Sequence, residues 1–239
     1  MNVLDYQAAW QAVIHHPLFG LGITLVVYQL AVAGYERTRS VLFQPVLFSM
    51  VVVIGVLLAS GLAYDDYRDS VLPLTLLLGP ATVALAVPLF LNLRRIRLLF
   101  WPIVLTLSIA GVFATLTGVL VAWLLGAEPL MLMTLAPKSV TSPIAMLVAE
   151  QIGGVAALAA VFVMITGVLG AILGPTLLRW LRVTHPAAQG MALGLTAHAV
   201  GTSRALQDST ESGAFAALAM SLMGVATAVI LPLVVALIT

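Results

Sequence analysis

Several apolar stretches of about 18 or more residues constrain the fold of this chain more than any other feature. As a helix, a stretch of that length crosses the roughly 30 Å of hydrocarbon in a bilayer. The composition agrees, because 62% of the residues are hydrophobic and 8% are charged, whereas about 25% are charged in soluble domains. The alternating pattern of membrane strands is absent. We therefore expect an all-α polytopic membrane protein embedded in a lipid bilayer.

The composition also argues against several other classes of protein. The chain has no cysteine, so disulfides and thiolate chemistry are excluded. Its four histidines do not have a metal-ligand spacing, and the scattered basic residues do not form a nucleic-acid footprint. No cofactor is expected apart from a coupling H⁺ or Na⁺. The first basic residue is Arg37, so the sequence lacks the n-region of a signal peptide and the first span is expected to be retained.

Six apolar segments are predicted to cross the membrane, after an interfacial helix over residues 1–16. The segments are 17–34, 41–62, 71–92, 99–126, 154–178 and 214–238. Basic loops follow the first and third segments, so the positive-inside rule places these loops in the cytoplasm and both termini outside. We expect residues 17–239 to form one transporter-like transmembrane domain.

Two further segments, at about 128–152 and 186–206, are apolar but contain helix breakers. As re-entrant hairpins meeting near the midplane they give a fold with six spans, and as full crossings they give eight. The positive-inside rule favours hairpins, because these leave Arg179 and Arg182 in the cytoplasm. Unpaired backbone is tolerated in hydrocarbon only where protein or a watery cavity covers it, so each interruption marks the inside of the bundle.

The first interrupted segment contains Lys138, the only lysine of the chain. Pro137 and Pro143 interrupt the helix, and Ser142 is a favourable N-cap for a half-helix that ends near Gln151. The positive end of that half-helix would point at the unwound stretch and favour an anion there. A charge at this depth costs about 2.5–3.5 kcal/mol on insertion scales and usually has a function. The alternative is a lysine that snorkels to the interface.

The second interrupted segment contains His198, with Gly194 and Gly201 as its expected breaks. A histidine titrates close to neutral pH, so His198 is a candidate for proton coupling or gating; the alternative is a hydrogen-bonded packing residue. Arg204 either binds a substrate or pairs with Asp208, one turn later in the chain.

Three other features leave two interpretations open. Gly79 and Pro80 either break or kink the third span. Glu150 is either the counter-ion of Lys138, with a part in coupling or gating, or a residue at the interface. Gly170 and Gly174 have the GxxxG spacing that allows close helix packing, although they also suit a sliding segment.

Four motifs occur in order along the chain: LLGPATVALAVPLF, LAPKSVTSPIAMLVAEQIGG, VFVMITGVLGAILGP and HAVGTSRA. Together they resemble the LrgB/CidB family of bacterial membrane proteins, which is called antiholin-like. The resemblance implies control of murein hydrolases together with a small LrgA/CidA-type membrane partner. Plastid relatives are similar to glycolate and glycerate carriers, and bacterial relatives are linked to pyruvate and other short carboxylates.

Two functions follow from these observations: a carrier of small carboxylates that works by alternating access, and a regulator of murein hydrolase export and autolysis. A carrier has a use for a buried lysine, a half-helix and an arginine, whereas a regulator has no evident use for them. An enzyme is not expected, because the serines near His198 lack an acid partner and an elbow motif. We also expect a homo-oligomer. The candidate substrate-binding residues carry positive charge or hydroxyl groups and are Lys138, Ser139, Thr141, Ser142, Thr202, Ser203 and Arg204.

Overall fold

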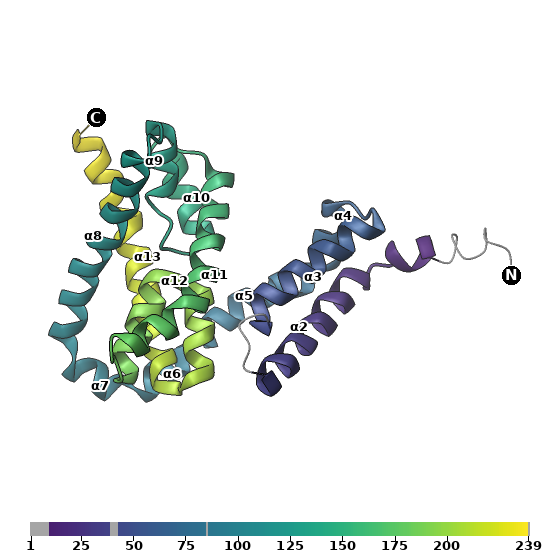
Figure 1. The fold of residues 1–239 in the computed structure, drawn as a ribbon, viewed down its shortest axis with the longest axis horizontal. Helices are drawn as coiled ribbons and strands as arrows, with labels where there is room; N and C mark the ends of the chain where they lie inside the picture. Colours follow the sequence, from purple (N-terminus) through teal and green to yellow (C-terminus); the bar gives the residue numbers. More distant parts are fainter. Residues whose placement is uncertain (1–9, 39–42, 85, 239) are drawn as a thin grey trace, which may run out of the picture. The chain divides into compact units, whose positions relative to one another are not determined.

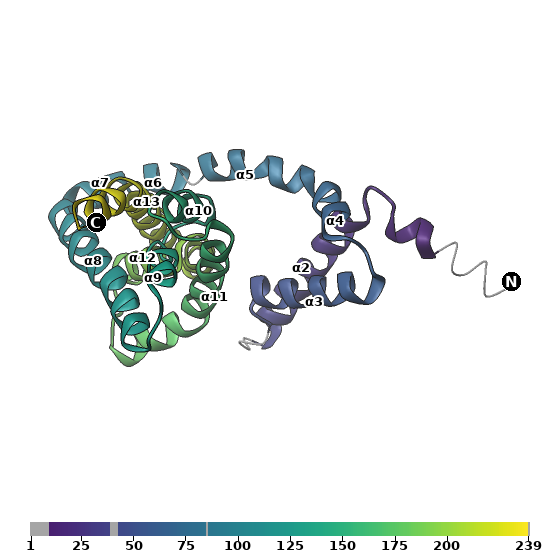
Figure 2. The ribbon, with the colours of Figure 1, turned by 90° about the horizontal axis from the view of Figure 1, so that it is seen from above.

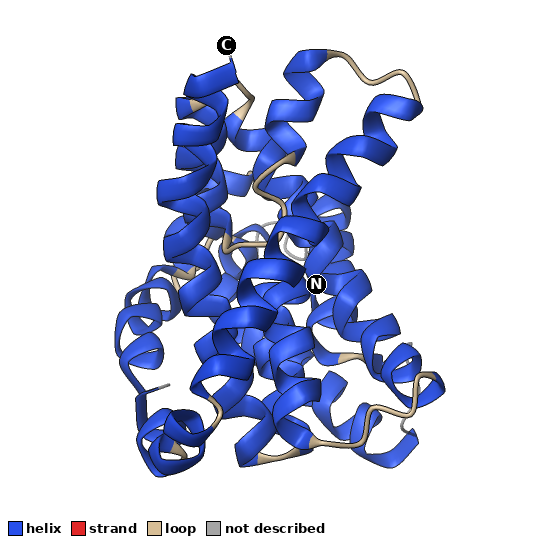
Figure 3. Cartoon of the chain, turned by 90° about the vertical axis from the view of Figure 1, so that its left-hand side faces the viewer, coloured by secondary structure: helices blue, strands red, loops and turns tan. Residues whose placement is uncertain are grey.

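The computed structural model describes residues 10–38, 43–84 and 86–238, and the regular elements of these residues are all helices (Figures 1 and 3). The all-α prediction is therefore confirmed. Of the predicted interfacial helix, residues 10–14 are helical and residues 1–9 lie outside the described part. The chain forms two compact units, 1–84 and 85–239. Both interrupted segments lie in the second unit.

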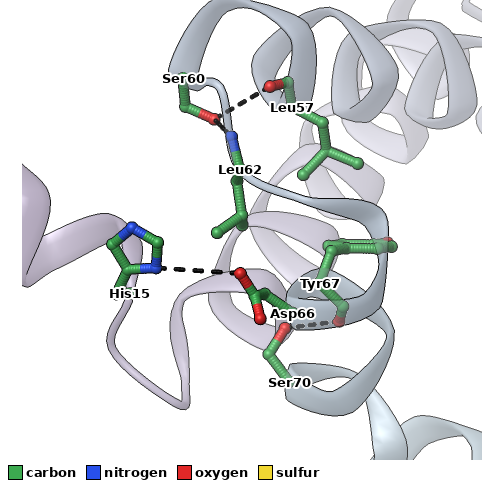
Figure 4. Close-up of polar contacts among 7 residues, drawn as sticks. All are labelled: His15, Leu57, Ser60, Leu62, Asp66, Tyr67 and Ser70. Carbon is green, nitrogen blue, oxygen red and sulfur yellow. Dashed lines mark hydrogen bonds and ion pairs between the residues drawn. The ribbon is translucent and has the colours of Figure 1, made fainter.

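The first unit contains four helices with defined ends. They are α2 (Phe19–Thr38), α3 (Pro45–Ser60), α4 (Tyr64–Ser70) and α5 (Leu72–Ala84). The Gln44 side chain caps the start of α3. Its end is closed by Ser60, whose hydroxyl donates to the Leu57 carbonyl at 3.2 Å and accepts from the Leu62 N–H at 3.4 Å (Figure 4). Gly61 follows at φ 70°, a conformation that glycine adopts without strain.

The acidic stretch between the second and third predicted spans is the short helix α4. Asp66 in its first turn complements the positive end of the helix. The Asp66 carboxylate lies 4.0 Å from His15 Nδ1, in the chain before α2 (Figure 4). The hydroxyls of Tyr67 and Thr24 lie 2.9 Å apart, which joins α4 to α2.

The third predicted span is divided between two helices. α5 continues through Gly79 and Pro80 and ends at Ala84, so of the two interpretations of this pair the break is wrong. A proline removes one helical hydrogen bond, and the bonds around it hold the helix together here. α6 (Ala86–Leu91) begins the second unit, and residue 85 lies outside the described part.

The second unit continues with seven helices of very different length. They are α7 (Leu93–Leu98), α8 (Phe100–Leu124), α9 (Pro129–Leu135), α10 (Ser142–Gln151), α11 (Ala156–Trp180), α12 (Pro186–Asp208) and α13 (Thr210–Ile238). Within the described residues, α2, α8, α11 and α13 are long and apolar enough to cross a membrane, and α3 is a shorter apolar helix. The chain is therefore a membrane protein.

Two shorter insertions separate the long helices of this unit. α9 and α10 follow α8 at one end, and α12 follows α11 toward the other end (Figure 1). Figure 2 shows α12 among α8, α11 and α13, the helices that it contacts. We call α9, the loop 136–141 and α10 hairpin 1, and α12 hairpin 2. Because a long helix separates them, the two hairpins enter the unit from opposite ends.

Hairpin 2 reverses its direction at His198, where the backbone has φ 42° and ψ −128°. A Cβ added at Gly201 would overlap the Leu193 carbonyl oxygen. In a straight helix, two residues eight positions apart would be separated by roughly 12 Å. The chain therefore folds back on itself. The arms of about 18 and 15 Å are too short to cross about 30 Å of hydrocarbon, which is the geometry of the predicted re-entrant hairpin. The number of crossings in the whole chain stays a prediction.

Glycines let hairpin 2 approach its neighbours closely, and they are not its break. A Cβ added at Gly190 would overlap the carbonyl of Ser212, and one at Gly194 would overlap that of Ala216. The first arm of hairpin 2 therefore runs parallel to the start of α13. The predicted breaks at Gly194 and Gly201 are wrong, because the reversal is at His198.

The GxxxG pair of α11 has the packing role predicted for it. A Cβ added at Gly170 would lie 2.6 Å from the Ala197 Cβ, and one at Gly174 would lie 2.7 Å from a Leu193 methyl group. Both contacts are to hairpin 2, so α11 and hairpin 2 pack through these glycines.

Candidate functional site

Hairpin 1 contains a six-residue break, 136–141, between α9 and α10. The Lys138 N–H donates to the Leu135 carbonyl at 3.0 Å, which makes a tight turn. The Ala145 N–H donates to the Thr141 carbonyl at 2.9 Å, and Thr141 is extended at φ −70° and ψ 149°. The N-cap of α10 is therefore Thr141, one residue before the predicted Ser142. The predicted half-helix up to Gln151 is confirmed.

Hairpin 1 is fastened by Thr134, a buried residue that the sequence did not single out. Its hydroxyl donates to the Leu130 carbonyl at 2.6 Å and accepts from the Val155 N–H at 2.9 Å. A Cβ added at Gly154 would lie 2.8 Å from the Thr134 nitrogen. These contacts join α9 to the chain that follows α10, so they hold the two arms of hairpin 1 together.

The Lys138 side chain lies across α8. Its Nζ donates to the Ala114 carbonyl at 3.0 Å and lies 3.3 Å from the Ser139 hydroxyl. A Cβ added at Gly118 would lie 2.5 Å from Lys138 Cε, so this glycine makes room for the lysine stem. Ala114 is near the middle of α8. The ammonium group thus lies beside the middle of α8 and not at its end, which favours the buried interpretation over snorkelling.

The charge of Lys138 has no carboxylate partner within the described residues. Glu150 is exposed near the end of α10 and does not pair with it, so nothing supports the counter-ion interpretation. A half-buried ammonium held only by neutral oxygens remains electrostatically uncompensated. The positive end of α10 begins four residues further along the chain. Both features favour an anion at the break.

His198 is packed and hydrogen-bonded at the tip of hairpin 2. Its side chain is 3% exposed, and Nε2 lies 2.9 Å from the Val163 carbonyl of α11. A carbonyl only accepts, so Nε2 carries the hydrogen. A Cβ added at Gly167 would lie 2.6 Å from the ring. The packing interpretation of His198 is confirmed, and its role in coupling or gating stays a prediction.

Thr202 and Arg204 of hairpin 2 are bonded within the hairpin or to α13. Thr202 donates to the His198 carbonyl at 2.9 Å and lies 3.7 Å from the Met220 sulfur. Arg204, on the returning arm, pairs with Asp208 at 2.9 Å, as the second interpretation of this arginine predicted. Ser203 beside it is partly buried. Of the predicted substrate ligands, the described polar contacts join only Lys138 and Ser139.

The two interrupted segments contribute apolar side chains to one buried cluster. Val140, from the break of hairpin 1, belongs to the same buried cluster as Leu195, which lies near the tip of hairpin 2. Phe215, Ala219 and Met223 of α13 complete this part of the cluster. The two segments therefore share a core, and the prediction that they meet near the midplane stays a prediction.

A charged contact that the sequence did not reveal joins α7 to the start of α13. Arg95 forms an ion pair with Glu211, 116 positions later in the chain. The second carboxylate oxygen of Glu211 and the hydroxyl of Ser212 are buried and have no hydrogen-bond partner among the described residues. Sequence reasoning missed the pair because no local pattern links positions so far apart.

Comparison with known proteins gives a consistent result over nearly the whole chain. A family model described as the LrgB-like family matches residues 24–237. An uncharacterized protein of Haemophilus influenzae is 35% identical over 212 residues, which cover 89% of this chain and 92% of that protein. The uncharacterized protein YwbG of Bacillus subtilis is 36% identical over 210 residues, 88% of this chain and 93% of that protein.

An antiholin-like protein LrgB of Bacillus cereus is more distant. It is 28% identical over 218 residues, which cover 91% of this chain and 95% of that protein. No solved structure gives a significant match.

Proposed function

The chain belongs to the LrgB-like family, and we propose that it is a secondary carrier of small carboxylates in a bacterial inner membrane. The substrates would be short hydroxy- or keto-acids of the glycolate, glycerate, lactate or pyruvate class. The observation that carries the proposal is Lys138, whose ammonium group lies against the middle of the long apolar helix α8 and has no carboxylate partner in the described chain.

A carboxylate beside Lys138 would compensate its charge. Two of the ammonium hydrogens are directed to the Ala114 carbonyl and the Ser139 hydroxyl, and the third is available to a ligand. The Thr141 and Ser142 hydroxyls, at the start of α10, are the nearest groups along the chain for a hydroxyl or keto oxygen. The first-turn N–H groups of α10 add a favourable field for the anion.

Alternating access follows from the two hairpins. Secondary transporters place broken helices at the centre of the membrane and move one group of elements against another. Hairpins 1 and 2 enter from opposite ends and share a core, so movement of either one would open the break to one side. Coupling to H⁺ or Na⁺ would make the transport uphill, with His198 as the proposed coupling group.

A second proposal is regulation of murein hydrolases. The observation that favours it is the name of several relatives, antiholin-like protein LrgB. Such a role would involve a homo-oligomer and a small LrgA/CidA-type membrane partner. The two activities are compatible, because a carboxylate flux coupled to H⁺ changes the proton gradient across the membrane.

Uptake of labelled glycolate, lactate and pyruvate into proteoliposomes tests the proposal. We expect the purified protein to raise the initial rate at least severalfold above that of protein-free vesicles for one or more of these acids. Ethanolamine, a cation of similar size, is the control and should not enter. If no short carboxylate enters under an imposed H⁺ or Na⁺ gradient, the carrier proposal fails and the regulatory one replaces it.

A further inference from the structure

An apolar groove of about 430 Å³ lies between α8 and α13. Small residues open it, among them Ser108 and Gly111 on α8 and Ala226 on α13. A Cβ added at Gly111 would lie 2.9 Å from the Met223 sulfur. The remaining lining is mostly aliphatic, so the groove offers little to a polar molecule by itself.

The groove and the Lys138 site involve the same stretch of α8. Thr115, which lines the groove, directly follows Ala114, whose carbonyl accepts from Lys138 Nζ at 3.0 Å. Gly111 also lines the groove and lies about one helical turn, or about 5.4 Å, before Thr115, so the two residues are on the same side of α8. From the opposite side, Met223 lines the groove and also belongs to the buried cluster that contains Val140. The acceptor of the uncompensated cation and a residue that lines the apolar groove are therefore neighbours on α8.

We propose that this groove binds the hydrocarbon chain of a monocarboxylate whose carboxylate group lies at Lys138. The substrates of the carrier would then include acids with a tail of several carbons as well as the shortest ones. This inference rests on the proposed function, because it takes Lys138 as the anion-binding group.

The arrangement of charge selects this occupant over two others. A helix of a second copy would fill the groove without an anion for Lys138. A phospholipid chain would fit the groove, but its phosphate belongs at the interface, about 15 Å from the middle of the hydrocarbon, whereas Ala114 is near the middle of α8. A short free carboxylate has its charge at one end and an apolar chain at the other. Its charge would compensate Lys138, and its chain would fill the groove.

Competition against a labelled short carboxylate tests the inference in wild-type proteoliposomes. We expect acetate, butanoate and hexanoate to inhibit with increasing strength, by about two- to fourfold for each added methylene that the groove covers. Hexanol and hexylammonium carry the same tail without the carboxylate and should not compete. Equal inhibition by acetate and hexanoate, or inhibition by hexanol as strong as that by hexanoate, would overturn the inference.

Two groove-filling variants locate the effect. Ala226→Phe and Ser108→Leu occupy the groove away from Lys138, so uptake of the short label should persist while the advantage of hexanoate over acetate disappears. Ser108 is exposed, so its variant is expected to fold even if the larger side chain at Ala226 is not accommodated. If the chain-length dependence survives in a folded variant, the tail does not bind here.

Absence of all carboxylate uptake in the wild type would defeat the proposed function itself, whereas short-acid uptake without chain-length dependence defeats only this inference.

Discussion

Lys138→Met is expected to lower carboxylate uptake by about tenfold to a hundredfold, because a hydrogen bond to a charged group contributes about 1.5–3 kcal/mol and 1.4 kcal/mol is tenfold. Methionine keeps an unbranched stem that can lie over Gly118, and it removes only the ammonium group. The initial rate in proteoliposomes, at a substrate concentration below the wild-type KM, measures the loss.

A stability measurement separates loss of function from loss of fold in this variant. Lys138 is half-buried without a carboxylate partner in the described chain, so replacing its charge with an apolar group should leave the Tm in detergent equal or higher. Glu150→Gln is the matched control, because it removes an exposed charge of hairpin 1 and should transport normally. Wild-type rates in a folded Lys138→Met protein would contradict the carboxylate site.

Gly194→Ala is expected to destabilise the protein by about 1–3 kcal/mol or more, as overpacking of a well-packed core does. The added methyl group would overlap the Ala216 carbonyl oxygen and lie 2.6 Å from the Ala216 Cα. These are backbone atoms of α13, so they cannot rotate away and hairpin 2 must separate from α13. The Tm in detergent and the fraction of monodisperse protein after heating measure the effect.

Gly22→Ala is the control for this prediction. The same methyl group added at Gly22, inside α2, would have no atom within 4 Å. Alanine is also the better helix former, so this change should leave the Tm unchanged or raise it slightly. Equal Tm values for the two variants would show that hairpin 2 does not pack closely on α13 through Gly194.

The long helices could be predicted from the sequence because length and hydrophobicity are local properties. The helix α11 (Ala156–Trp180) lies within two residues of its predicted bounds, and the half-helix α10 ends where it was expected. The position of the breaks was harder to predict. A glycine can interrupt a helix or let another helix approach, and Gly194 does the latter because α13 lies against it. Local sequence does not distinguish these roles, since the deciding atoms come from another helix.

The candidate site can likewise be predicted only in part, because some of its contacts come from distant parts of the chain. Lys138 is recognisable because a single lysine in an apolar segment is expensive. Its acceptor on α8 and the glycine beneath its stem come from another part of the chain, and no pattern around Lys138 reveals them. The charge of Arg204 groups it with Lys138 in the sequence. In the structure, Arg204 instead forms an ion pair with Asp208, one turn away along the same helix.

The most direct test of the account uses the fact that Lys138 is the only lysine of the chain. Reductive methylation of the purified protein, followed by peptide mass spectrometry, reports the reactivity of this one side chain separately from the N-terminal amine. A carboxylate site at Lys138 predicts that glycolate, lactate or pyruvate slows methylation of Lys138 severalfold in a concentration-dependent way, while ethanolamine has no effect and the N-terminal amine reacts unchanged. A rate of Lys138 methylation that none of the three carboxylates alters would contradict it.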